Sequence, residues 1–211
     1  MRYRMTTPEV LHQHFFDDSL PNAVTKVTSR LTSHGFLLSH PLFATQTYFG
    51  LGPNGAKVMG LSPRKVGPLG PQSLLTEFGI LSFCCRGPIQ RERLRVCELS
   101  EYNPALLARG LDSSHYYLDT DQNTTRFGLI RVDGGGDVAH IVRRVRQDIE
   151  HREQVPAFRQ LILDDRFLVA IVTLSNEKRS ALEQELQKLS TPVSFRVEVV
   201  PELRPLLVRH D

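Results

Sequence analysis

The segment from Gly60 to Pro71 constrains the fold more than any other feature, because it holds three glycines and three prolines. Neither a helix nor a central strand can run through such a sequence. We therefore expect two units, residues 1–62 and residues 72–211, joined by a linker over residues 63–71. A chain of 211 residues is long enough for two small domains.

Charge is distributed unevenly between these units. Residues 1–70 carry seven Lys or Arg side chains and three acidic ones, whereas the rest of the chain is close to neutral. Hydrophobic residues make up 40% and charged residues 23%, which is typical of a globular protein. A small basic unit beside a neutral one suggests a nucleic-acid-binding module joined to another domain.

The first unit has the element order of a winged helix-turn-helix. Thr7 and Pro8 open a helix, and Ser19 is expected to cap a second helix that buries Ala23, Val24, Val27 and Leu31 and ends at Gly35. Two strands, 36–40 and 46–51, follow as a hairpin, and another helix begins near Ala56. In this motif the second helix enters the major groove and the hairpin approaches the DNA backbone.

The residue types on the second helix suit DNA recognition. Asn can read adenine, Arg can read guanine, and Ser, Thr and Lys can bond phosphate oxygens. The expected DNA contacts on this helix are Asn22, Thr25, Lys26, Ser29, Arg30 and Ser33. On the hairpin, with its tip over residues 41–46, they are His40, Thr45 and Thr47, of which His40 adds charge only when protonated.

The second unit reads as a three-layer α/β domain. We expect helices over 72–86, 137–163 with a break near Pro156, and 175–189. Strands are expected over 96–99, 114–119, 126–133, 167–173 and 193–200, with the apolar run 167–173 in the middle of a covered sheet.

Several segments in this order resemble the replication-relaxation family of plasmid and integrative-element proteins. They are Arg30-Leu31-x-x-x-Gly35-Phe36, Tyr48–Gly55, Ile130–Asp133, and the run 167–173 followed by Glu177-Lys178-Arg179. The resemblance covers nearly the whole chain and implies a winged helix in front of a PD-(D/E)XK nuclease-like domain. In that domain type, acids on a strand pair hold a divalent metal.

This sequence departs from the family's pattern at the positions expected to hold the metal ion. Asp119 and Asp133 match expected acids, but Arg131 occupies the position of another acidic ligand. A guanidinium cannot ligate Mg²⁺, so we expect a catalytically degraded domain in which Arg131 pairs with Asp119 or Asp133. No other catalytic motif or cofactor site is found, and Cys84, Cys85 and Cys97 lack the spacing of a zinc site.

The sequence thus predicts a DNA-binding protein of a mobile genetic element, acting as a transcriptional regulator or as an accessory factor in replication or transfer. We expect a cytoplasmic homodimer without a membrane span, with residues 72–211 available to a protein partner. One alternative is a relaxase-like nicking enzyme that uses Mg²⁺ or Mn²⁺ on Asp119 and Asp133. The other is a protein-interaction module without DNA binding.

Overall fold

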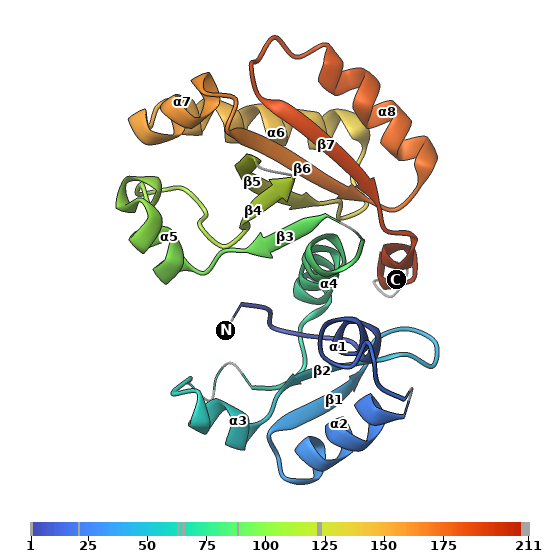
Figure 1. Ribbon diagram of the computed structural model, residues 1–211. Coiled ribbons are helices and arrows are strands. Elements are labelled where there is room, and N and C mark those ends of the chain that lie inside the picture. The colour runs from blue at the N-terminus through green and yellow to red at the C-terminus, as the bar shows by residue number, and fades with distance from the viewer. Residues whose placement is uncertain are drawn as a thin grey trace.

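The structure is a computed structural model that describes residues 2–20, 22–62, 64, 66–87, 89–121 and 124–207. It is a mixed α and β fold with one two-stranded and one five-stranded sheet (Figure 1). The fold class predicted from the sequence is confirmed at this level. None of the helices in these ranges is long and apolar enough to cross a bilayer.

The N-terminal elements follow the predicted order. They are α1 (Pro8–Phe15), α2 (Ala23–Ser33), β1 (Leu37–Pro41), β2 (Thr47–Leu51) and α3 (Pro53–Val58). Thr7 caps α1 as expected, since its side chain accepts a hydrogen bond from the Val10 amide at 3.3 Å. The prediction for Ser19 is wrong, because α2 begins later and has Asn22 at its N-cap.

Two glycines fix the hairpin against the end of α2. Gly35 has φ +70°, a left-handed conformation that ends the helix and favours glycine. A Cβ on Gly52 would lie 2.3 Å from the Gly35 carbonyl oxygen, so only glycine allows this approach. Asn54 adds a side-chain hydrogen bond to the His34 carbonyl at 2.7 Å. The angle between α2 and the hairpin is therefore set by backbone contacts.

The remaining elements form the larger sheet and its covering helices. The helices are α4 (Pro71–Cys85), α5 (Val96–Tyr102), α6 (Val138–Glu153), α7 (Pro156–Leu163), α8 (Asn176–Gln187) and α9 (Arg204–Leu207). The strands are β3 (Gln90–Arg93), β4 (Tyr116–Asp121), β5 (Thr124–Val132), β6 (Phe167–Thr173) and β7 (Ser194–Val199). The strand expected over 96–99 is wrong, because these residues begin α5, where Glu98 bonds back to the Arg95 amide.

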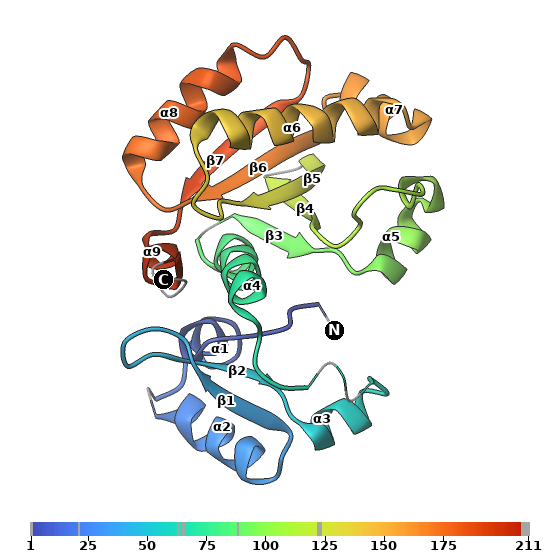
Figure 2. The ribbon, with the colours of Figure 1, turned by 180° about the vertical axis from the view of Figure 1, so that it is seen from behind.

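The five strands lie in chain order, β3-β4-β5-β6-β7. The first three are antiparallel and the last three are parallel. Helix α4 covers one face, and α6, α7 and α8 cover the other, which gives three layers (Figures 1 and 2). Every residue of β6 is buried, as the apolar run predicts for a central covered strand.

One hydrophobic cluster includes residues on both sides of the Gly- and Pro-rich segment. Met5, Val10, Leu42 and Tyr48 share it with residues of α4, β5, β6 and the C-terminal turns. Phe43, next to Leu42, packs edge-on against Phe78 of α4 with ring centroids 5.9 Å apart. The two-stranded sheet is thus held against α4 by apolar packing as well as by the chain connection.

Candidate nucleic-acid interface

All six residues predicted on the second helix are exposed, Asn22 at the N-cap of α2 and the other five within it. At 3.6 residues per turn, Thr25, Ser29, Ser33, Lys26 and Arg30 cover an arc of about 140°. The Ser33 hydroxyl already donates a hydrogen bond within the helix, to the Arg30 carbonyl at 2.9 Å. The structure therefore gathers the predicted contacts on one polar side of the helix.

The buried side of α2 differs from the expected one. Val24 is buried, but Val27 and Leu31 remain 39% and 37% exposed. Thr28 takes the second buried position, because its hydroxyl donates to the Val24 carbonyl at 2.8 Å and so satisfies its polar group inside the helix. The buried side was predicted from the spacing of apolar residues alone, and this pattern does not include a threonine that can be buried in this way.

The charge on this side of α2 is entirely positive. Lys26 and Arg30 are exposed and form no ion pair within the described residues. No acidic residue occurs in the sequence between Asp18 and Glu77. This acid-free stretch is a sharper signal than the charge balance of residues 1–70, because it coincides with α2, the hairpin and α3.

Helix α2 lies at the end of the molecule farthest from the five-stranded sheet in both views (Figures 1 and 2). The large sheet and its helices α6, α7 and α8 lie at the opposite end.

The hairpin residues predicted to contact DNA are less exposed than the sequence suggests. The tip predicted over residues 41–46 does not project freely, because Leu42 is fully buried and Phe43 packs on α4. Thr45 is exposed, whereas His40 and Thr47 are half-buried. Burial also lowers the pKa of His40, so this side chain gains charge only in more acidic solution than an exposed histidine would.

The two acids proposed for a metal site lie far apart. Asp119 on β4 pairs in register with Arg126 on β5, and Asp133 follows the end of β5. Asp133 follows Arg126 by seven steps of extended chain, which corresponds to about 23 Å. Asp119 and Asp133 therefore do not fit a shared Mg²⁺ or Mn²⁺ ion of the kind that the nicking-enzyme alternative requires.

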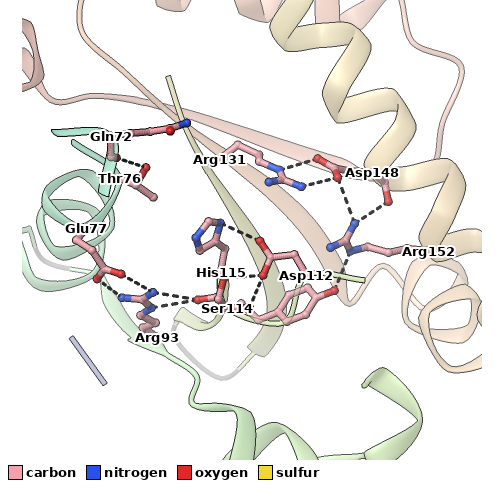
Figure 3. Close-up of polar contacts among 11 residues, drawn as sticks. Gln72, Thr76, Glu77, Arg93, Asp112, Ser114, His115, Arg131, Asp148 and Arg152 are labelled. Carbon is pink, nitrogen blue, oxygen red and sulfur yellow. Dashed lines mark hydrogen bonds and ion pairs between the residues drawn. The ribbon is translucent and has the colours of Figure 1, made fainter. Parts of the chain in front are cut away.

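Arg131 does not pair with either of these acids, contrary to expectation. It makes a bidentate bond to Asp148 of α6, with Nε to Oδ2 at 2.6 Å (Figure 3). Asp133 instead pairs with Lys178 at 2.7 Å, and Asp119 pairs with Arg196 at 2.6 Å. Each acid is thus neutralised by a cation from another element.

The described residues bear on metal binding and on the environment of the cysteines. No group of three His, Cys, Asp or Glu side chains there could hold a metal ion. The three cysteines are free thiols, and burial raises the pKa of Cys84 to about 12. Cys84 therefore stays protonated near neutral pH and acts as an apolar group in the core.

No family model matches the chain, and comparisons with curated proteins and with solved structures likewise give no match.

Proposed function

We propose that this protein binds double-stranded DNA through the polar side of α2. The observation that carries the proposal is the exposed, acid-free arc on which Lys26 and Arg30 have no ion-pair partner among the described residues. Positive groups free of internal partners can neutralise phosphates and release counterions, which is the main source of affinity for DNA. The position of α2 at one end of the molecule supports the same use.

Some residues of the arc suit contacts with bases, and others suit contacts with the phosphate backbone. Arg30 can bond guanine in the major groove, and Asn22 can bond adenine from the start of the helix. Lys26, Thr25 and Ser29 can bond phosphate oxygens. Gly35 and Gly52 hold the hairpin at a fixed angle to α2, so exposed Thr45 would reach the backbone only on the side that this angle allows.

The test compares DNA binding by the full chain and by the Lys26→Ala/Arg30→Ala double variant, measured by fluorescence anisotropy with labelled duplexes at several salt concentrations. We expect a loss of about 1–3 kcal/mol if Arg30 reads a base, and a smaller salt slope from the lost phosphate contact of Lys26. The matched control is Arg179→Ala/Lys188→Ala, which removes the same charge from exposed positions on α8 and just after it.

Equal affinity of the α2 variant and the parent chain would contradict the proposal. Equal losses in both double variants would show that only net charge matters. A failure of the parent chain to bind at low salt would favour the protein-interaction module.

The wider role rests on the resemblance to replication-relaxation proteins. We propose regulation of transcription, or assistance in replication or transfer of a mobile element, with a homodimer presenting two copies of α2. Palindromic half-sites about one helical turn apart would then bind more tightly than a single half-site. We expect supercoiled plasmid to stay uncut with Mg²⁺ or Mn²⁺, because Asp119 and Asp133 are separated along the sheet.

A further inference from the structure

A second polar site lies in the five-stranded unit, away from α2. A cavity of about 430 Å³ opens between the first turns of α4, the end of β5 and the first turns of α6. Gln72 and Thr76 of α4 line one side, and His115, Arg131, His140 and Arg144 line the others. Figure 3 shows the first four of these side chains around a common space. Its volume is that of a site for one small molecule.

The described lining of the cavity holds two arginines, Arg131 and Arg144, and one carboxylate. Asp133 is the one carboxylate in its described lining, and its side chain is completely buried. Its oxygens accept hydrogen bonds from the Gly135 amide at 2.9 Å and the Thr173 hydroxyl at 3.0 Å, beside the ion pair with Lys178. The negative charge of Asp133 is thus compensated on the side of β6 and α8.

Two of the acids just outside the lining, Glu77 and Asp148, are paired with arginines. Glu77 pairs with Arg93 at 2.5 Å, Asp112 accepts from the Ser114 amide at 2.9 Å, and Asp148 holds Arg131. The one carboxylate in the described lining is thus already paired with Lys178. Arg144, in contrast, is exposed and has no ion-pair partner within the described residues. The cavity therefore favours an anion.

A buried network fixes the orientation of Arg131. Arg152 is 1% exposed, pairs with Asp148 at 3.5 Å, and donates to the Tyr116 hydroxyl at 3.0 Å (Figure 3). Asp148 in turn binds Nε and Nη2 of Arg131, which leaves Nη1 outside that bond. Burying such a network is costly, and its most exposed member is the guanidinium at the cavity wall. An arginine held in one orientation loses little entropy when it binds a ligand.

We propose that this cavity binds the phosphate group of a small phosphorylated molecule. Two guanidinium groups at a concave site match the geometry and charge of phosphate oxygens. The Gln72 amide and the first turn of α4, which contains no acidic residue, add neutral and dipolar donors. A cavity enclosed by two helices and a strand end admits one small molecule more readily than the continuous backbone of a duplex.

The experiment uses the full chain, with inorganic phosphate and adenosine monophosphate as probes and sodium chloride at equal ionic strength as reference. Binding is followed by calorimetry and by thermal melting. We expect saturable one-site binding that weakens at least about tenfold in Arg144→Ala. Arg146→Ala is the matched control, since it removes an exposed arginine of α6 that does not line this cavity.

Arg131→Lys serves as a second variant, because it keeps the positive charge near Asp148 but loses the bidentate geometry. Weaker phosphate binding with an unchanged melting temperature in the absence of ligand would support the proposal.

Three results would overturn it. The first is no saturable binding of either probe up to about 10 mM, and the second is equal losses in Arg144→Ala and Arg146→Ala. The third is loss of duplex DNA affinity in Arg144→Ala without any phosphate binding by the parent chain, which would assign Arg144 to the DNA backbone. Failure of the α2 variants to change DNA binding would leave the cavity result untouched, so the two proposals fail separately.

Discussion

At the scale of single residues, the environment decides the role of each ionisable group. Asp119, Asp133 and Asp148 are chemically alike, yet each has a different cation from a different element beside it. The histidines show the same dependence, because burial lowers the pKa of His115 and of His40 below the ordinary value. Predictions at this scale concern what happens when such a compensated group changes its charge.

Protonation of His115 is expected to destabilise the fold. Burial is the main cause that lowers its pKa below the ordinary 6.5; Arg93 and Arg131 lower it further, while Asp112 and Glu77 oppose them. Between the lowered pKa and 6.5 the unfolded chain binds more protons, so the free energy of unfolding falls as the pH falls through 6.5. Urea unfolding at about pH 7.5 and about pH 5.5 should show a smaller difference in His115→Gln than in the parent chain. An unchanged difference would mean that His115 titrates normally.

Asp148 should matter more for stability than Arg131, the more exposed of the two arginines that it binds. Asp148→Asn leaves Arg131 and the buried Arg152 without a compensating charge, and we expect a loss of about 3 kcal/mol or more. Arg131→Gln removes a partly exposed partner and should cost less, because Arg152 still compensates Asp148. Thermal or urea unfolding of both variants measures this order, and a larger loss in Arg131→Gln would contradict it.

At the scale of elements, a hairpin with an exposed tip and one with a packed tip can have similar sequences. The hairpin β1–β2 has the length and turn of a wing, but Leu42 and Phe43 at its tip insert into the cluster around α4. The hairpin thus serves partly as a structural link between α4 and the first unit. Its contribution to stability follows from this packing.

Leu42→Ala should destabilise the protein by about 2–5 kcal/mol, since it removes a fully buried side chain and leaves a cavity. Thr45→Ala, at the exposed part of the same tip, should be close to neutral in stability. Urea unfolding of both variants separates a packed tip from a free one. Equal and small effects would restore the interpretation of the tip as a projecting wing.

At the scale of the whole molecule, the shared cluster couples the two units. Met5, Val10 and Tyr48 are buried together with Phe78, Leu168 and other residues from the far side of the Gly- and Pro-rich segment. Units that share a hydrophobic cluster lose contacts together when either one opens. The segment from Gly60 to Pro71 interrupts regular structure between α3 and α4, while the packing continues across it.

We therefore expect one cooperative unfolding transition. Far-ultraviolet circular dichroism, and tyrosine fluorescence sensitive to Tyr48 and Tyr117, should give coincident urea curves. Met5→Ala should shift the whole curve without splitting it. Two separated transitions would show that residues 1–62 and 72–211 unfold independently.

The sequence alone determined most of the elements and the polar side of α2. Thr7 and Pro8, the apolar run 167–173, and the break at Pro156 are local signals, because capping, periodicity and proline geometry act over a few neighbouring residues. Strand β3 and helix α5 escaped prediction, since arginines and glutamates dominate β3 and its stability comes from partners such as Glu77 and Glu198.

Tertiary structure alone decided the pairings and the cavity. Asp148 meets Arg131, and the hairpin tip meets α4, across distances in sequence that no local pattern encodes. The sequence indicated that Asp119 and Asp133 were candidate acids, but the antiparallel register of β4 and β5 placed them far apart. Long-range electrostatic and apolar contacts depend on how whole elements pack, so side chains of ordinary appearance acquire their roles only in the folded molecule.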